Sequence, residues 1–281
     1  MRKLSIWSSY YVDLDPYAMV DELKKSGIKY SELSDEHALM LLKEGDDVVA
    51  TGKKFKKYAD KHGVEFPQGH LWLGAQINHN SENTIETLKK WILLFEAVGV
   101  KNMVLHCDSQ FDNKSASEKQ KLDNNIAVLK ELKEFLAGKD VVICLENLID
   151  YVADSEKLMY IVNSLDCDNF GICLDTGHLN MANRYNHAKQ SQREFILACG
   201  KKLKALHIAD NDGNDDEHIM PFCNGNVDFK EVFKTLEEIG YDGLYNYEIP
   251  GERRCSLEIR KLKADYIKAA FESFSRDFCL K

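Results

Sequence analysis

Five apolar segments between residues 102 and 248 each finish with a side chain that can bind a metal ion. In chain order they are His106 in NMVLHC, Glu146 in VVICLEN, Asp175 in FGICLDTGH, His207 in LKALHIAD and Glu248 in LYNYEIP. Carboxylates and imidazoles gathered in one place would repel one another or take up protons unless a cation neutralised them. The mixed nitrogen and oxygen donors suit Zn²⁺, Mn²⁺ or Co²⁺, so these segments predict a divalent metal site.

Further candidate ligands stand close to these five. His178 follows Asp175 by three residues in DTGH, and His70 stands at the third expected strand. The segment DNDGNDDEH contains Asp216 and His218, whose side chains point the same way if the backbone there is extended. These two residues could share a metal ion, and the alternative for the segment is a solvated acidic turn.

Short apolar or β-branched runs alternate with longer segments of helical period, a pattern typical of repeated βα units. Strands are expected at Leu4–Ser8, Lys29–Leu33, His70–Gln76, Asn102–His106, Val141–Glu146, Phe170–Asp175, Ala205–Ala209 and Leu244–Glu248. Helices are expected at Pro16–Lys25, Ser81–Ala97, Ser117–Leu136, Ser155–Leu165, Asn186–Ala198, Phe229–Ile239 and Leu257–Phe274. This pattern predicts a single (β/α)8 TIM barrel with residues 1–281 as one domain, and the carboxyl ends of its strands would bring the candidate ligands together.

The competing fold is a doubly wound open sheet. That fold usually has a glycine-rich phosphate-binding turn after its first strand, and Ser8-Ser9-Tyr10 stands there instead. The second and third βα cycles give the weakest pattern, because Lys43–Lys57 is charged and interrupted by glycine. No linker or low-complexity tract divides the chain, so the barrel is favoured.

The alternation of side chains along a strand also predicts what lies beneath the candidate site. Cys144 shares a face with Glu146, Cys173 with Asp175, Ala205 with His207 and Asn246 with Glu248. These residues should fill the barrel below the ligands, so the cysteines among them are packing residues. The chain has eight cysteines and no CxxC pair, which favours reduced thiols over disulfides or a thiolate metal site.

Composition excludes several classes of function. The formal net charge is −9, which argues against general affinity for nucleic acid or anionic membranes, because polyanion binding needs clustered lysine and arginine. The N-terminal segment lacks a long apolar stretch, and no run of about 18 apolar residues occurs. We therefore expect a cytoplasmic protein without a membrane span, acting alone or as a homo-oligomer.

Four motifs together resemble the xylose isomerase-like barrel superfamily: LEN at 145–147, GICLDTGH at 171–178, HIADNDGNDDEHIMPFCNGNVDF at 207–229 and YEIP at 247–250. That superfamily includes sugar isomerases and epimerases, inosose-processing enzymes and apurinic endonucleases of the endonuclease IV type. The resemblance spans essentially the whole chain in order and spacing, and it is more specific for the superfamily than for a reaction.

The resemblance implies two ligand sets. In the ketose epimerases one metal ion is held by the positions matching Glu146, Asp175, His207 and Glu248; the two glutamates handle substrate protons, and His178 lies near the substrate. In the endonucleases three zinc ions use those four positions and the ones matching His70, His106, His178, Asp216 and His218. The resemblance thus implies one to three ions of zinc or manganese per chain. Two departures concern the substrate pocket: Asn211-Asp212-Gly213 replaces an epimerase arginine, and Pro221-Phe222-Cys223-Asn224-Gly225 replaces a PGxG motif.

The first hypothesis is a metal-dependent isomerase or epimerase of a sugar, sugar phosphate or cyclitol. The metal would polarise a carbonyl and a neighbouring hydroxyl, and one glutamate would remove the proton from the adjacent carbon to give an enediolate. Glu146 and Glu248 could then act as base and acid on opposite faces of the substrate.

The second hypothesis is hydrolysis of a phosphodiester at abasic DNA sites by a three-metal cluster. The acidic segment disfavours it, because a DNA clamp needs basic and aromatic groups at the mouth. Arg253 and Arg254 follow Glu248 and could bind one phosphate or simply be solvated, and Trp7 could stack on a sugar or pack in the barrel. A third hypothesis is a metal-binding barrel without catalysis. The favoured partner is therefore a small carbohydrate, and nucleic acid is disfavoured.

Overall fold

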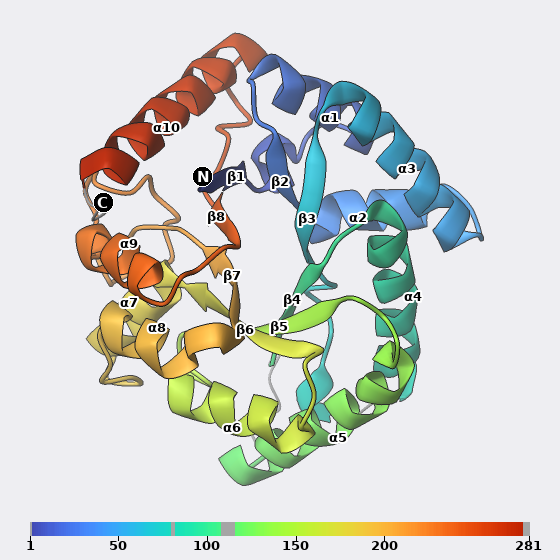
Figure 1. Ribbon diagram of the computed structural model, residues 1–281, viewed down its shortest axis with the longest axis vertical. Helices are drawn as coiled ribbons and strands as arrows, with labels where there is room; N and C mark the ends of the chain where they lie inside the picture. The colour runs from blue at the N-terminus through green and yellow to red at the C-terminus, as the bar shows by residue number, and fades with distance from the viewer. Residues whose placement is uncertain (1, 80–81, 108–115, 278–281) are drawn as a thin grey trace.

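A computed structural model describes residues 2–79, 82–107 and 116–277 of the chain. Eight parallel strands follow one another in the order β7-β6-β5-β4-β3-β2-β1-β8, and helices surround them (Figure 1). The two ends of this order meet: the amide of Ile208 donates to the carbonyl of Asn246 at 2.7 Å, and the amide of Glu248 donates to the carbonyl of Ile208 at 3.1 Å. The predicted (β/α)8 barrel is confirmed.

The strands of the barrel are short, and each runs from the bottom of the barrel to its mouth. Their bounds are β1 Lys3–Ile6, β2 Tyr30–Leu33, β3 Glu65–His70, β4 Asn102–His106, β5 Val142–Glu146, β6 Phe170–Asp175, β7 Leu203–His207 and β8 Leu244–Tyr247. The predicted bounds of β4 and β6 are confirmed at both ends, and most other strands begin or end within two residues of the prediction.

The prediction for the third strand was wrong, because His70 ends β3 rather than starting it. Pro67 and Gly69 hide the true strand, since both residues are unfavourable for a β-strand. Gly69 is needed because a Cβ there would lie 2.8 Å from the ring of Phe95 on the covering helix. After His70 the backbone turns, with the amide of Ala75 donating to the carbonyl of Trp72 at 3.0 Å. The apolar run LWLG is therefore a loop at the mouth.

The helices of the outer layer are α1 Pro16–Lys25, α2 Asp35–Leu42, α3 Val48–His62, α4 Glu82–Val98, α5 Glu118–Leu136, α6 Ser155–Leu165, α7 Thr176–Arg184, α8 Gln192–Cys199, α9 Phe229–Glu238 and α10 Leu257–Asp277. The predicted helix Asn186–Ala198 was wrong at its start. Asn186 has φ +62°, a left-handed conformation, and Ser191 begins α8 with a capping box to Glu194. Residues Thr176–Arg184 form α7, for which no helix was predicted.

The barrel interior below the mouth contains a small apolar layer. Val104, Cys144, Cys173 and Ala205 are fully buried against one another, as the alternation of side chains predicted for three of them. Asn246 is also buried there and accepts a hydrogen bond from the hydroxyl of Ser5 at 2.7 Å. This packed layer forms the floor beneath the ionisable side chains at the strand ends.

The described cysteines are all free thiols, and Cys107, Cys144, Cys173 and Cys199 are buried. Cys223 and Cys255 are exposed, and Cys279 lies outside the described residues. Across the described part of the chain, no helix combines the length and the apolar character needed to cross a membrane.

Candidate metal centre

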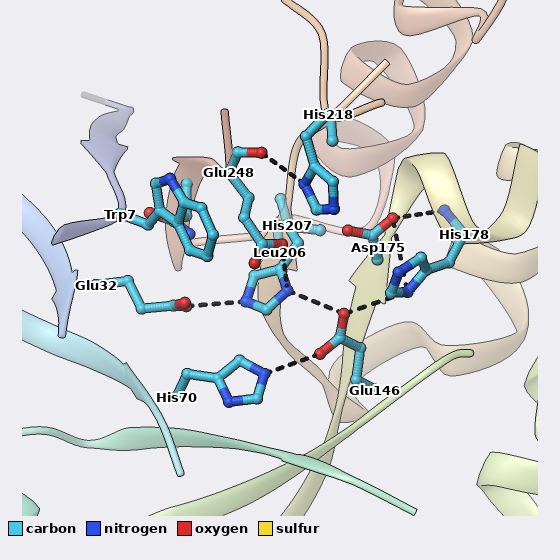
Figure 2. Close-up of polar contacts among 12 residues, drawn as sticks. Trp7, Glu32, His70, Glu146, Asp175, His178, Leu206, His207, His218 and Glu248 are labelled. Carbon is cyan, nitrogen blue, oxygen red and sulfur yellow. Dashed lines mark hydrogen bonds and ion pairs between the residues drawn. The ribbon is translucent and has the colours of Figure 1, made fainter. Parts of the chain in front are cut away.

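Four of the predicted ligands meet at the barrel mouth, where β5, β6, β7 and β8 end. Each of Glu146, Asp175, His207 and Glu248 offers a ligand atom, these atoms lie within 4.8 Å of one another, and all four residues are buried. Nδ1 of His207 lies 3.0 Å from Oε1 of Glu146 and 2.9 Å from Oε2 of Glu248. Figure 2 shows these side chains pointing toward a common centre.

Asp175 contributes an oxygen that the protein itself does not satisfy. Its Oδ1 atom accepts a hydrogen bond from the amide of His178 at 2.6 Å and so caps the start of α7. Its Oδ2 atom is buried and has no hydrogen-bond partner among the described residues. An unsatisfied buried carboxylate oxygen is costly, and a cation held by this four-donor cluster would satisfy it. The residues present therefore fit a divalent metal ion.

A second donor group adjoins the first and shares Glu146 with it. Oε2 of Glu146 lies 3.0 Å from Nε2 of His106 and 3.4 Å from Nε2 of His70. A third group forms around Asp216, whose Oδ2 atom lies 3.3 Å from Nε2 of His178 and 3.1 Å from Nε2 of His218. All nine predicted donors are thus brought together in three adjoining groups. Their role as metal ligands stays a prediction.

Backbone carbonyls set the tautomer of three of these histidines. Nδ1 of His70 donates to the carbonyl of Leu71 at 2.8 Å, and Nδ1 of His178 donates to the carbonyl of Asn147 at 2.9 Å. His218 does the same with the carbonyl of Glu248 at 2.8 Å. A carbonyl can only accept, so Nδ1 carries the proton and Nε2 faces the donor groups, an arrangement typical of metal-ligating histidines.

The acidic segment DNDGNDDEH is not a simple solvated turn. Asp210 and Ile219 pair as an antiparallel bridge, with hydrogen bonds of 3.0 and 2.9 Å, which folds the segment back on itself. His218 has φ +47°, and this left-handed conformation places it beside Asp216 and His178. Asp212, Asp215 and Glu217 remain exposed, so only part of the segment faces the site.

Glu32, near the end of β2, was not among the predicted ligands. This residue is fully buried, and its Oε2 atom lies 3.0 Å from Nε2 of His207, on the ring edge opposite Glu146 and Glu248 (Figure 2). Gln68 donates its side-chain amide to the same oxygen. A sequence signal for Glu32 was present, because it stands one position before the end of the expected strand Lys29–Leu33, much as the five strand-end candidate ligands stand at the ends of theirs.

When no cation is present, protons on histidines such as His70 and on Asp175 offset the negative charge of the carboxylates at the site. Burial alone would raise the pKa of Glu146, but the neighbouring His207 and His106 hold it well below its usual range. Burial opposes the charge of His70, yet its hydrogen bond to Glu146 raises the pKa of His70 to about 9. Burial, together with the charges of Glu248 and Glu146, raises the pKa of Asp175 to about 7. Metal ions would replace such protons, so cation binding and proton release are linked.

Of the residues predicted to contact a substrate, Trp7 lies beside a donor residue and the two arginines line a cavity with it. The ring of Trp7 stacks on His218 with centroids 6.2 Å apart, and its Nε1 donates to the carbonyl of Ile249 at 3.0 Å. Arg253 and Arg254 stand on the loop between β8 and α10 and share a cavity of about 480 Å³ with Trp7.

Comparisons with known proteins agree on the fold. In solved structures, a D-tagatose 3-epimerase-like protein superposes with a TM-score of 0.75 at 24% identity, covering 99% of this chain and 100% of that one. The IOLI protein, crystallised with a bound zinc atom, superposes with a TM-score of 0.79 at 20% identity, with coverage of 99% and 100%.

Sequence relatives cover smaller shares. An uncharacterised protein of Methanocaldococcus jannaschii is 37% identical over 155 residues, 54% of this chain and 51% of that protein, so the chain spans about half of that relative. A probable endonuclease 4 of Mycoplasmopsis synoviae is 24% identical over 210 residues, 68% of this chain and 73% of that protein. An L-ribulose 3-epimerase of Methylomonas sp. is 27% identical over 130 residues, 44% and 41% of the two chains.

A family model described as the xylose isomerase-like TIM barrel matches residues 20–275, nearly the whole barrel. The sequence resemblance is thereby confirmed, and the chain belongs to the xylose isomerase-like TIM barrel family.

Proposed function

We propose that the protein is a divalent-metal-dependent isomerase or epimerase of a small carbohydrate. The observation that carries this proposal is the pair of glutamates at one buried centre. Carboxylate oxygens of Glu146 and Glu248 lie 3.0 and 2.9 Å from the same nitrogen of His207. They come from strands that are not neighbours, so they can approach a bound substrate from different directions. The names of the similar ketose epimerases support the same class of reaction.

The four-donor cluster of Glu146, Asp175, His207 and Glu248 would hold the metal ion. When bound, the ion supplies Lewis acidity that makes the proton beside a sugar carbonyl easier to remove. Both glutamates have pKa values below the usual range, Glu248 because His207 and His218 outweigh the effect of burial. They are therefore ionised at neutral pH, and each can accept a proton from a carbon atom of the substrate.

The remaining side chains would orient the substrate and exclude water. One glutamate removes the proton. The other first takes up a proton from solvent and then returns it from a different side, to the same carbon, which inverts the configuration, or to the former carbonyl carbon, which moves the carbonyl. His178 is fixed by the carbonyl of Asn147 and presents Nε2 at the mouth, where it can hydrogen-bond a sugar hydroxyl when the third donor group holds no ion. The buried apolar layer below the cluster closes the site on the side away from the mouth.

Solvent deuterium uptake tests this proposal directly. The metal-loaded protein is incubated in D₂O with a panel of ketoses and ketose phosphates, and deuterium at the carbon beside the carbonyl is measured. We expect uptake into at least one sugar, with a loss of about 100-fold or more in the Glu146→Gln and Glu248→Gln variants. The exposed Glu65→Gln variant, at the opposite end of the barrel, is the matched control. No uptake across the panel by protein shown to contain metal would refute the proposal.

Hydrolysis of a phosphodiester is a second candidate, favoured by the two additional donor groups. His70 and His106 beside Glu146, and Asp216 between His178 and His218, extend the centre beyond what a one-metal epimerase needs. Relatives named probable endonuclease 4 point the same way. The exposed acids of the segment 210–218 oppose the approach of duplex DNA.

The two candidates respond differently to loss of His106. A His106→Ala variant should lose phosphodiester cleavage and retain deuterium exchange, because His106 is outside the four-donor cluster. Rapid, metal-dependent nicking of an oligonucleotide with one abasic site, abolished by His106→Ala, would favour phosphodiester hydrolysis over the isomerase or epimerase reaction.

A further inference from the structure

The loop between β8 and α10 is held rigidly beside the candidate metal centre. The guanidinium of Arg260 is buried; its Nε donates to the carbonyl of Gly251 at 2.8 Å, and its terminal nitrogens bind Asp13. Gly251 itself is pressed against Tyr10, since a Cβ at Gly251 would lie 1.8 Å from the carbonyl oxygen of Tyr10. Lys263 donates to the carbonyl of Pro250 at 2.7 Å. These contacts fix the loop on the first and last βα units.

The tip of this loop is a tight turn that presents two arginines. Glu252 has φ +56°, and its carbonyl accepts a hydrogen bond from the amide of Cys255 at 2.7 Å. Arg253 and Arg254 therefore occupy the centre of the turn. The position of their backbone is set by the contacts of this loop with Arg260, Lys263 and Tyr10.

Two acids near these arginines, Asp13 and Glu252, already have other partners. Asp13 is bound by Arg260, and Glu252 pairs with Lys263 at 2.7 Å. Within the described part of the chain, neither Arg253 nor Arg254 forms an ion pair. Arg253 and Arg254 are exposed, and the charge of Asp13 acts on Arg253. In a protein with a net charge of −9, two consecutive arginines on one turn are a local concentration of positive charge that can bind an anion.

The cavity lined by these arginines is linked to the candidate metal centre through Trp7. It has a volume of about 480 Å³, and Trp7 and Ser9 form its wall on the side of β1. Trp7 also stacks on His218, which belongs to the third donor group. Trp7 is thus the side chain common to the cavity and to the surroundings of the third donor group.

We propose that this cavity is a subsite for a phosphate group, and that the substrate class is a phosphorylated carbohydrate. The charge of a phosphate monoester dianion matches two guanidinium groups, and its oxygens match their paired donors. The indole of Trp7 would contact the carbon skeleton between the phosphate and the reacting carbon. This inference rests on the proposed function, because it assumes that the carbohydrate reacts at the four-donor cluster.

The test compares phosphorylated and free ketoses on the metal-loaded protein. Dissociation constants are measured by calorimetry for D-fructose 6-phosphate, D-ribulose 5-phosphate and the two unphosphorylated sugars, with a hexuronate as a carboxylate probe. We expect at least one phosphorylated ketose to bind about 10- to 100-fold more tightly than its free counterpart. The Arg253→Ala/Arg254→Ala variant should lose that preference, and the Arg253→Lys/Arg254→Lys variant should keep part of it.

The matched control is Lys53→Ala/Lys57→Ala, which removes the same charge from the exposed face of α3. It should leave the preference unchanged. Equal binding of phosphorylated and free ketoses, a preference that survives in the double alanine variant, or tighter binding of the hexuronate would each overturn the subsite. Deuterium exchange on the same sugars separates the two proposals: exchange without a phosphate preference refutes only the subsite, whereas an arginine-dependent preference without exchange refutes only the proposed reaction.

Discussion

Oε2 of Glu32 lies 3.0 Å from Nε2 of His207, although the two residues are 175 positions apart in the sequence. A carboxylate cannot donate a hydrogen bond when ionised, so Nε2 of His207 carries the proton and Nδ1 is left for the four-donor cluster. The other three histidines with a fixed tautomer are held by backbone carbonyls and present Nε2 instead. His207 is thus oriented by a side chain from the opposite side of the barrel.

Replacing Glu32 should weaken metal binding without removing a ligand. Glu32→Gln keeps the shape of the side chain but removes the charge that orients and polarises His207. We expect the affinity for Zn²⁺ to fall about 10- to 100-fold, measured by competition with a chelating dye. Glu32→Asp should restore part of it, and Glu65→Gln should have no effect. Unchanged affinity in Glu32→Gln would show that the contact is only structural.

Much of the site could be predicted because its residues follow a rule that is local in sequence. A ligand at the end of each late strand is visible in single motifs, and the alternation of side chains correctly placed Cys144, Cys173 and Ala205 beneath them. Glu32 was missed because β2 is short and polar, so no apolar run drew attention to its end. Its partnership with His207 depends on closure of the barrel, which no local pattern shows.

The errors in the fold have equally specific causes. β3 contains Pro67 and Gly69, two residues whose local preference is for a turn. Pairing with the neighbouring strands nevertheless keeps the segment extended, and the close approach of Phe95 requires a glycine at position 69. α7 begins directly at the metal-ligand motif, with Asp175 as both cap and candidate ligand. A helix that starts within a functional motif has a polar, glycine-containing first turn, and this obscured its hydrophobic period.

The three donor groups predict the metal content of the chain. Protein purified without chelator and dialysed against Zn²⁺ should contain about three zinc ions, one for each group. The His106→Ala variant should lose one of them and keep the ion at the four-donor cluster, as measured by atomic emission. The exposed His187→Ala variant is a control for nonspecific binding. A single zinc ion in both the wild-type protein and His106→Ala would mean that the additional groups do not bind metal.

Asp175 should make the metal-free protein less stable as the pH rises. Burial raises its pKa from 3.8 to about 7, so its contribution to stability is fully present below pH 3.8 and is lost as the pH rises through 7. Asp175→Asn retains the side-chain oxygen that caps α7 but carries no charge. In EDTA, its free energy of unfolding should exceed that of the wild-type protein by a few kcal/mol at pH 8, and by less at pH 5.

Zn²⁺ should reverse this order. The wild-type protein gains stability by binding the ion, and Asp175→Asn gains little because it lacks one charged ligand. Urea unfolding of both proteins at the two pH values, with and without Zn²⁺, gives the free energy of unfolding under all four conditions. If Asp175→Asn were less stable than the wild-type protein in EDTA at pH 8, the buried charge of Asp175 would not be what destabilises the metal-free protein.

The fixed position of Gly251 gives a test of the loop that carries the two arginines. Gly251→Ala places a Cβ atom 1.8 Å from the carbonyl oxygen of Tyr10, so the loop must move away from β1. We expect the free energy of unfolding to fall by about 1–3 kcal/mol, from urea titration. The same displacement moves Arg253 and Arg254 from the wall of the cavity, so affinity for phosphorylated ketoses should fall while that for free ketoses changes little.

Gly45→Ala is the matched control, because no atom lies within 4 Å of a Cβ at that position. It should preserve both stability and binding. Loss of stability in Gly251→Ala with an intact phosphate preference would mean that the arginines find the phosphate without the fixed loop. The rigid frame around Gly251 and Arg260 would then serve only to close the barrel between its first and last βα units, since both residues join the β8–α10 loop to the segment after β1.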